Sequence, residues 1–239
     1  MNTIKIQKGN TKMVAHRGVS GLELENTCAA FVAAGNRSYE GVETDVHVTS
    51  DGKFIIIHDD NTGRVAVDAM VVEQTDYETL RALQLKQTDG MLRTDLHLPS
   101  LEEYLSICKH YDKVCVLELK NPMEEEAVKG IIETCKAVYS LDKMIFISFA
   151  FQNMLYIRKY APDAEAQYLL AEEITQTHID SLAEHKLDLD SHYLAMSEEL
   201  VKRLHDRGIR VNCWTVDDPE IAQRLVSWGV AYITSNILE

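Results

Sequence analysis

The chain has 239 residues, of which 46% are hydrophobic, and a formal net charge of −14 at pH 7. This charge excludes the sequence-independent nucleic-acid binding that a basic surface provides, although a metal ion and one arginine can still bind a small anion inside a cleft. No stretch is long and apolar enough for a transmembrane helix, so we expect no stable membrane insertion.

Two further features concern the cellular compartment. The first 13 residues are polar and lack the apolar core of a signal peptide. The five cysteines have no paired spacing and mostly fall in apolar segments, which is typical of free, buried thiols in a reducing compartment. We therefore expect a cytoplasmic protein. The sequence leaves the oligomeric state open, with a homodimer as one option.

Residues 41–58 are predicted to form two strands joined by a tight turn. The turn, at 49–52, contains Ser, Asp and Gly and lies between the apolar runs 41–48 and 53–58. A parallel connection needs a dozen residues or more, so this short link forces an antiparallel hairpin. The hairpin would bring His58 back beside Glu43 and Asp45, the two carboxylates of the strand 41–48.

One strand precedes this hairpin, and strands and helices alternate regularly after it. The further strands are expected at 12–16, 113–119, 144–149, 164–169, 187–191, 209–214 and 230–234. The helices are expected at 28–34, 100–110, 123–139, 152–160, 175–185, 197–207 and 219–228. Without the return strand of the hairpin, eight strands remain, most of them followed by a helix. This pattern predicts an α/β fold, specifically a (β/α)8 TIM barrel with one extra hairpin strand.

The segment 59–98 has no regular pattern beyond a helical patch at 77–85. We interpret it as a small insertion after the second barrel strand, inside a single domain that spans residues 1–239. We expect the insertion to cover the site. The next helix then starts after Ser100, the predicted N-cap, with Glu103 as its partner in a capping box.

Acidic side chains gather on two of the predicted barrel strands. Residues two apart on a strand share a face, so Glu43 and Asp45 point the same way, as do Glu118 and Lys120. Barrel active sites lie at the carboxyl ends of the strands, where three unpaired carboxylates would be unstable. A hard cation such as Mg²⁺ or Ca²⁺ would stabilise them. The alternative is a structural ion network in which Arg17 and Lys120 neutralise them.

Two histidines lie at strand ends beside these carboxylates, and imidazole exchanges protons near neutral pH. His16 and His58 therefore suit a general acid–base pair of the kind that phosphate-ester cleavage requires. Arg17 and Lys120 would bind phosphate oxygens, the alternative being surface ion pairs. Trp214 is interpreted either as a core residue or as a pocket wall that packs on the substrate. The remaining loop and helix histidines are assigned no role: His97, His110, His178, His185, His192 and His205.

At these residues the sequence resembles the glycerophosphodiester phosphodiesterase family. The motifs that carry the resemblance are His16-Arg17-Gly18, Glu25-Asn26-Thr27-Cys28-Ala29-Ala30-Phe31, Glu43-Thr44-Asp45-Val46, Thr49-Ser50-Asp51-Gly52, His58-Asp59, Leu98-Pro99-Ser100-Leu101-Glu102-Glu103, Glu118-Leu119-Lys120 and Trp214-Thr215-Val216. The resemblance covers nearly the whole chain, and the spacing of its first motifs is highly specific. It implies a barrel enzyme that uses a divalent ion to hydrolyse deacylated phospholipids to glycerol 3-phosphate and an alcohol.

The resemblance also implies a set of site residues. These are three ligands of one Mg²⁺ or Ca²⁺ ion, two acid–base groups and two phosphate-binding cations: Glu43, Asp45, Glu118, His16, His58, Arg17 and Lys120. Which histidine is the acid, and whether water or the substrate's own hydroxyl attacks, stays open. An alternative function is a lysophospholipase D or phospholipase-C-like activity on lipid, with Ala66–Val72 as a candidate apolar rim. Another is a binding protein without catalysis.

Three positions depart from the family's pattern. Leu24 replaces the usual proline before Glu-Asn-Thr, and Asn61–Arg64 replaces a Thr-Leu-x-Arg run. The segment Thr234–Asn236 stands where a Thr-Asp pair is expected. We expect none of these departures to touch the implied site residues, and the last two to alter the rim of the pocket.

Overall fold

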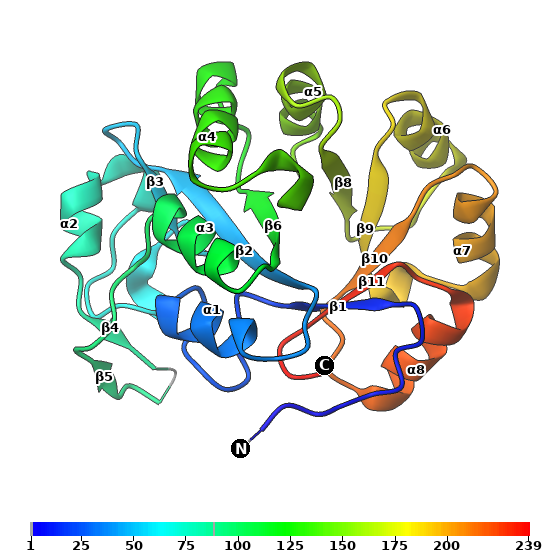
Figure 1. Cartoon of the computed structure of the whole chain (residues 1–239). Coiled ribbons are helices and arrows are strands. Elements are labelled where there is room, and N and C mark those ends of the chain that lie inside the picture. Colours follow the sequence, from blue (N-terminus) through cyan, green and yellow to red (C-terminus); the bar gives the residue numbers. More distant parts are fainter. Residues whose placement is uncertain (1, 88) are drawn as a thin grey trace.

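A computed structural model of the protein describes residues 2–87 and 89–239. Within these residues, a nine-stranded sheet closes into a barrel surrounded by helices (Figure 1). All its strands except the antiparallel β3 run parallel to their neighbours, and β1 closes the barrel by pairing with both β2 and β11. The predicted (β/α)8 barrel is confirmed. Its parallel strands are β1 (Lys12–Ala15), β2 (Gly41–Val48), β6 (Val114–Leu119), β7 (Met144–Ser148), β8 (Glu165–Leu170), β9 (Asp188–His192), β10 (Val211–Trp214) and β11 (Tyr232–Ser235).

The helices begin and end where local signals predict. Thr27 caps the first helix by accepting a hydrogen bond from the backbone of Ala30, and the predicted capping box of Ser100 and Glu103 is present. The last helix ends at Gly229, whose φ of +82° is left-handed. The helices are α1 (Cys28–Gly35), α2 (Tyr77–Arg81), α3 (Leu101–His110), α4 (Glu125–Val138), α5 (Phe151–Tyr160), α6 (Gln176–Glu184), α7 (Glu198–His205) and α8 (Pro219–Trp228).

The predicted hairpin is also confirmed. The return strand β3 (Phe54–Ile56) is shorter than expected and runs antiparallel to β2, with Val46 opposite Ile56. The backbone N–H of Ile57 donates to the carbonyl of Asp45 at 3.1 Å. The chain therefore leaves the hairpin at His58 beside the acidic face of β2.

The segment 59–98, which we call the insertion, has more structure than its sequence predicts. It contains α2 and a small hairpin of β4 (Leu85–Lys86) and β5 (Leu92–Arg93), and Figure 1 shows them on the side of the barrel where β3 lies. The predicted helical patch ends at Arg81, before the predicted residue 85. Two-residue strands give no detectable alternation in the sequence, which is why this hairpin was missed.

The insertion packs on a hydrophobic cluster that is separate from the main core and to which Leu24, Ile55 and Ile57 from outside the insertion also contribute. Within the stretch considered as an apolar rim, Ala66 and Val72 are fully buried in that cluster. Val67 and Val71 are 48% and 43% exposed. The side chains of this stretch therefore divide between that cluster and the surface.

The main core lies between the barrel and its helices, and a second set of apolar side chains fills the barrel itself. That inner set includes Val14, Val116 and Ile145. The five cysteines are free thiols; four are buried as predicted and Cys28 is half-buried. Among the described residues, no helix has the length and apolar character needed to cross a membrane.

Candidate active site

Three carboxylates from adjacent barrel strands converge as the sequence predicts. Glu43 and Asp45 share one face of β2, and Asp45 lies opposite Glu118 in the register of β2 with β6. One oxygen of each carboxylate lies within 4.8 Å of the other two. All three residues are less than 10% exposed. We call these three residues the acidic cluster.

The electrostatics of the acidic cluster suit a cation. Burial and the charge of Asp45 raise the pKa of Glu43 well above its usual range, and raise the pKa of Glu118 to about 7. Burial acts on Asp45 too, but Lys120 and Arg17 outweigh it and hold the pKa of Asp45 at about 2. The pKa values of Glu43 and Glu118 are both raised because negative charge is buried in excess, and a divalent cation would neutralise that charge.

The ion network considered as the alternative is partly present. Lys120 Nζ lies 2.8 Å from Glu118 Oε1 and 3.6 Å from Asp45 Oδ1. Arg17 Nε lies 3.6 Å from Asp45 Oδ2, which is too long for a hydrogen bond. Arg17 Nε and Asp45 Oδ1 are both buried without a hydrogen-bond partner among the described residues. Buried polar atoms are normally paired, so the hydrogen-bonding capacity of these two atoms is not met by the described residues.

The loop after β1 places Arg17 by an unusual backbone path. Arg17 has a left-handed φ of +51°, and its backbone N–H donates to Glu43 Oε2 at 2.7 Å. The next residue, Gly18, has a φ of +76°, and a Cβ there would lie only 2.6 Å from the backbone of Ala30. Glu25 accepts from Arg17 Nη1 at 2.8 Å. These contacts explain why His-Arg-Gly and Glu-Asn-Thr occur together.

His16 is held by a chain of polar contacts from the end of the barrel. Asp217 accepts from Asn236 Nδ2 at 2.6 Å, and Asn236 Oδ1 lies 2.7 Å from His16 Nδ1. A carboxylate only accepts, so the Asn236 amide must direct its oxygen at His16, and His16 must carry its proton on Nδ1. Burial and Arg17 lower the pKa of His16 to about 4. The expectation that departures from the family pattern leave the site untouched is therefore wrong at Asn236.

His58 is held by an acidic neighbour. Its Nδ1 lies 2.6 Å from Asp59 Oδ1, and burial lowers the pKa of His58 despite the opposing charge of Asp45. Arg64 donates from Nε to Asp59 Oδ2 at 2.6 Å and from Nη1 to Glu25 Oε2 at 2.6 Å. Arg64, the residue that the segment 61–64 shares with the Thr-Leu-x-Arg run, thus orders the partners of both His58 and Arg17.

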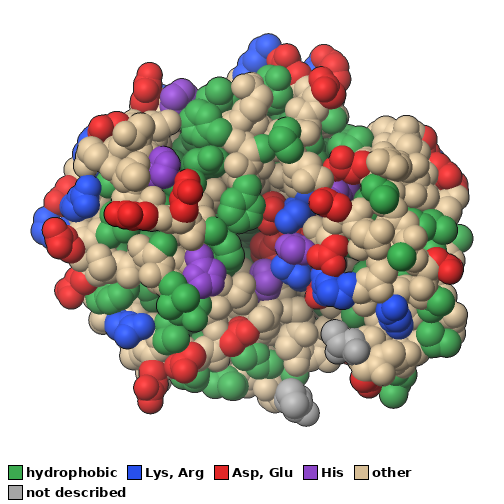
Figure 2. Space-filling model, turned by 180° about the vertical axis from the view of Figure 1, so that it is seen from behind, with side chains coloured by type: hydrophobic (Ala, Val, Ile, Leu, Met, Phe, Trp, Pro, Cys, Tyr) green, Lys and Arg blue, Asp and Glu red, His purple; other side chains and the backbone are tan. Residues whose placement is uncertain are grey.

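The two histidines open on one cavity. Figure 2 shows a face of the molecule hollowed near its centre, where acidic, basic and histidine side chains gather. His16, Arg17, Glu43, His58 and Glu118 line one side of the cavity, whose opposite side carries Ile147, Phe149, Leu169, Asp190 and Trp214. Among the described residues, Asp45 and Lys120 do not line the cavity and instead contact its acidic lining.

A profile of the glycerophosphoryl diester phosphodiesterase family matches residues 16–238. The chain belongs to this family. The family resemblance inferred from the motifs is confirmed, and the protein is therefore a phosphodiesterase of the barrel type.

Several known proteins resemble this family member over more than nine-tenths of their length. A glycerophosphodiester phosphodiesterase of Caldanaerobacter subterraneus is 27% identical over 227 residues, 92% of this chain and 91% of that protein. A solved Oleispira antarctica phosphodiesterase, in complex with the product sn-glycerol-3-phosphate, superposes with a TM-score of 0.87 at 25% identity, covering 95% of this chain and 93% of that one. A solved glycerophosphodiester phosphodiesterase of Parabacteroides distasonis superposes with a TM-score of 0.80 at 27% identity, covering 96% of this chain and 94% of that one.

Trp214 lies at the cavity of this phosphodiesterase, as one of the two interpretations predicts. Its ring packs edge-on against Phe149 and His192, at centroid separations of 5.8 and 5.3 Å. Its indole Nε1 is buried and has no hydrogen-bond partner among the described residues. The tryptophan therefore forms part of the cavity wall, and its indole donor is unused among the described residues.

One cavity residue was missed in the sequence. Asp190 lies on β9, is 2% exposed, and has one carboxylate oxygen without a hydrogen-bond partner among the described residues. Burial and Glu118 raise the pKa of Asp190 well above its usual range. The available signal was the pair Asp188 and Asp190, which a spacing of two residues places on the strand face opposite to that of Leu189.

Proposed function

We propose that this protein hydrolyses glycerophosphodiesters to sn-glycerol 3-phosphate and an alcohol, with one divalent cation and two histidines. The observation that carries the proposal is that His16 and His58 line the same small cavity as Arg17 and two members of the acidic cluster. Family membership supports the reaction, and the product bound to the Oleispira antarctica relative supports the class of substrate.

Glu43, Asp45 and Glu118 would hold the cation. Their donor atoms are all carboxylate oxygens, which is the set that Mg²⁺ and Ca²⁺ prefer, and the unpartnered Oδ1 of Asp45 fits a ligand role. A bound divalent cation would oppose the charge on the phosphoryl oxygens and polarise the phosphorus toward attack. The raised pKa values of Glu43 and Glu118 support such a partner for their carboxylates.

His16 would act as the general base. The Asp217–Asn236 chain keeps the proton on Nδ1, which leaves Nε2 as the free lone pair, 4.0 Å from Glu43 Oε2. A low pKa keeps this imidazole neutral at pH 7 and ready to accept a proton. His16 Nε2 then takes the proton of the attacking hydroxyl.

His58 would act as the general acid. Asp59 accepts from its Nδ1 at 2.6 Å and so stabilises the imidazolium form that donates from Nε2 to the departing alkoxide. Arg64 in turn fixes Asp59, with contacts at 2.6 and 3.0 Å. The partners support this division of roles, because a neutral amide holds His16 whereas a carboxylate holds His58.

Arg17 would bind the phosphate and Trp214 the carbon skeleton, while Lys120, which lies outside the described lining of the cavity, would act on the phosphate through its charge alone. The Arg17 guanidinium lies in the cavity lining with its buried Nε unpartnered, and a phosphate oxygen would satisfy it. Lys120 supplies positive charge behind the acidic cluster. The face of Trp214 offers apolar contact to the three-carbon backbone of the substrate.

A substrate panel tests the proposed function. Purified protein supplied with Mg²⁺ or Ca²⁺ should release sn-glycerol 3-phosphate from glycerophosphocholine and glycerophosphoethanolamine. The same assay with a lysophospholipid tests the lipid alternative, and a faster rate on the lipid would replace the proposal. Tight binding of a diester without product would instead indicate a binding protein. The cytoplasmic location stays a prediction; the five free thiols support it.

A further inference from the structure

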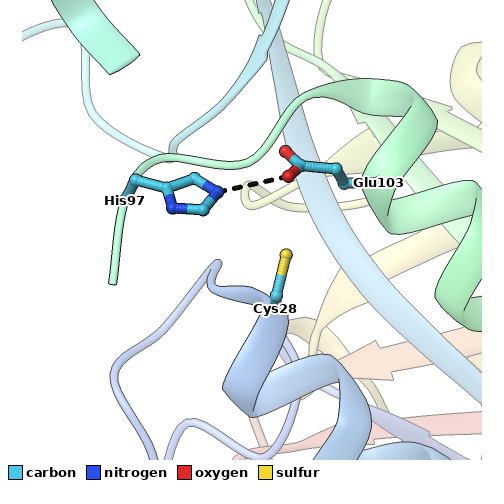
Figure 3. Close-up of side chains that lie close together, drawn as sticks. All are labelled: Cys28, His97 and Glu103. Carbon is cyan, nitrogen blue, oxygen red and sulfur yellow. Dashed lines mark hydrogen bonds and ion pairs between the residues drawn. The ribbon is translucent and has the colours of Figure 1, made fainter. Parts of the chain in front are cut away.

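Three side chains able to bind a metal meet outside the active-site cavity. Cys28 is the first residue of α1, Glu103 lies in the first turn of α3, and His97 comes from the loop before α3. One ligand atom of each lies within 4.8 Å of the other two. Figure 3 shows the thiol of Cys28 directed toward the other two side chains, which contact each other.

Glu103 is already held in an orientation that leaves one oxygen weakly engaged. Its Oε2 accepts from the backbone N–H of Ser100 at 2.8 Å and from Arg81 Nη1 at 2.5 Å. Its Oε1 lies 3.2 Å from both Arg81 Nη2 and His97 Nε2. Carboxylates that bind metals are commonly fixed in this way by partners on the other oxygen. Oε1 is therefore the natural ligand atom.

The chemistry of the three groups favours a borderline-soft ion. A thiolate, an imidazole and one carboxylate oxygen are ligands of Zn²⁺, whereas Mg²⁺ and Ca²⁺ prefer all-oxygen sites. The side chains of His97 and Glu103 are 43% and 35% exposed, and Cys28 is half-buried. An ion can therefore enter from solvent and keep a water molecule as its fourth ligand.

We propose that Cys28, His97 and Glu103 form a binding site for Zn²⁺ or a similar borderline-soft divalent ion, separate from the acidic cluster. In a tetrahedral site the ligand atoms lie about 3.5 Å apart. His97 Nε2 and Glu103 Oε1 already lie 3.2 Å apart, and Cys28 Sγ, within 4.8 Å of a ligand atom of each, would complete the site by small rotations of the side chains. Their partial exposure allows this movement. The site would join the start of α1 to the end of the insertion and to α3.

Binding of the ion exchanges protons in a defined way. Burial and the charge of Glu103 raise the pKa of Cys28 to about 11, so the ion-free thiol is protonated. The ion displaces this proton to solvent and forms a bond to Sγ. The proton that His97 Nε2 shares with Glu103 in the ion-free protein moves to Nδ1, leaving Nε2 to bind the ion. One proton is released in total.

The position of Cys28 gives this site a structural consequence. Two residues earlier, Asn26 Nδ2 donates to Asp45 Oδ2 at 2.8 Å, and Thr27 caps α1. An ion on Cys28 would therefore fix the segment that supports the acidic cluster. Since a ligand that binds only the folded state stabilises it, Zn²⁺ should raise the Tm of the wild-type protein.

Cobalt spectroscopy tests the proposal on the full-length protein. Co²⁺ is titrated into ion-free protein in the presence of excess Mg²⁺, which occupies all-oxygen sites. We expect one equivalent of Co²⁺ to bind, with a near-ultraviolet thiolate-to-cobalt charge-transfer band that Zn²⁺ removes. The acidic cluster has no sulfur and cannot give this band. The other four cysteines are at most 1% exposed.

Matched variants assign the band to the three residues. Cys28→Ser should abolish it, and His97→Ala should weaken Co²⁺ binding by at least about tenfold. His110→Ala, at the other end of α3, should leave the charge-transfer band and the affinity for Co²⁺ unchanged. A wild-type protein without the band, a Cys28→Ser variant that keeps it, or equal affinity in His97→Ala would overturn the proposal.

A second measurement needs no variant. Zn²⁺ should slow the alkylation of Cys28 by iodoacetamide at least about tenfold, as followed by peptide mass spectrometry, because a zinc-bound thiolate is withdrawn from reaction. Equal alkylation rates with and without Zn²⁺ would contradict the site even if Cys28→Ser failed to fold. Both readouts are independent of the proposed hydrolysis.

Discussion

The two sides of the cavity differ in chemistry and in their origin in the chain. One side carries the charged and histidine groups of β1, β2, the hairpin end and β6, which all come from the first 120 residues. The other side is mostly apolar and comes from β7, β8, β9 and β10. The difference teaches that the charged and histidine groups of the cavity come from short motifs near the start of the chain, while the later strands supply its apolar wall.

The largest effect should come from the charged side. His16→Ala and His58→Ala should each lower kcat by about 10²–10⁴-fold, because each removes one proton-transfer group. The loss is measured as release of sn-glycerol 3-phosphate. His110→Ala, on the outside of the barrel, serves as the control and should keep wild-type turnover. Near wild-type activity in either cavity variant would mean that the two imidazoles do no chemistry.

A smaller loss of turnover should follow from removing the contact that fixes the tautomer of His16. Asn236→Leu should lower kcat by about 10–100-fold, because it removes the acceptor that keeps the proton on Nδ1. Asn236→Asp should retain activity but shift its pH profile. A carboxylate beside His16 raises the pKa of that histidine, and a base works only above its pKa, so the acid limb of kcat/KM should move to higher pH. An unmoved acid limb would argue against His16 as the base.

The apolar side should affect binding more than chemistry. Trp214→Ala should raise KM by about tenfold, about 1.4 kcal/mol, with little change in kcat, because the lost apolar contact exists in both the ground state and the transition state. Trp228, the other tryptophan, lies on α8 outside this cavity and provides the matched control as Trp228→Ala. A fall in kcat at constant KM would instead place Trp214 on the reacting side.

The smallest expected change is a rise in the free energy of unfolding when Asp190 is replaced by Asn. The pKa of Asp190 is raised in the folded state, so the folded protein binds more protons than the unfolded chain, and its stability falls as pH rises above the unfolded value of 3.8. Asp190→Asn removes this penalty. Urea unfolding without added metal should show a gain of about 1–2 kcal/mol at pH 8 and less at pH 5. A loss of stability at pH 8 would show that the carboxylate has a partner.

Much of the fold follows from local sequence patterns. Alternating apolar runs predict the barrel strands, and the length of the turn at 49–52 alone dictates the antiparallel hairpin. The small hairpin within the insertion was not predictable because its strands are two residues long. One of its residues, Leu85, packs in a hydrophobic cluster whose contacts link residues far apart in the sequence.

Like the fold, the candidate site is only partly predictable from local sequence patterns. The acidic cluster is predictable because Glu43 and Asp45 share one strand face, and the motif spacing identifies the histidines. The contact of Asn236 with His16 spans 220 positions in the chain, and that of Arg64 with Glu25 spans 39. No local pattern encodes such contacts; the first arises when the barrel closes β11 against β1, and the second when the insertion packs beside the loop after β1.

Turnover before and after metal removal tests the central claim most directly, namely that the acidic cluster holds one divalent ion at the cavity where the two histidines act. The Cys28→Ser variant is the best material, since it lacks the proposed zinc site. Chelated protein should release no sn-glycerol 3-phosphate from glycerophosphoethanolamine, and Mg²⁺ or Ca²⁺ should restore the reaction, but not in Asp45→Asn. Full turnover by the ion-free protein would contradict the claim.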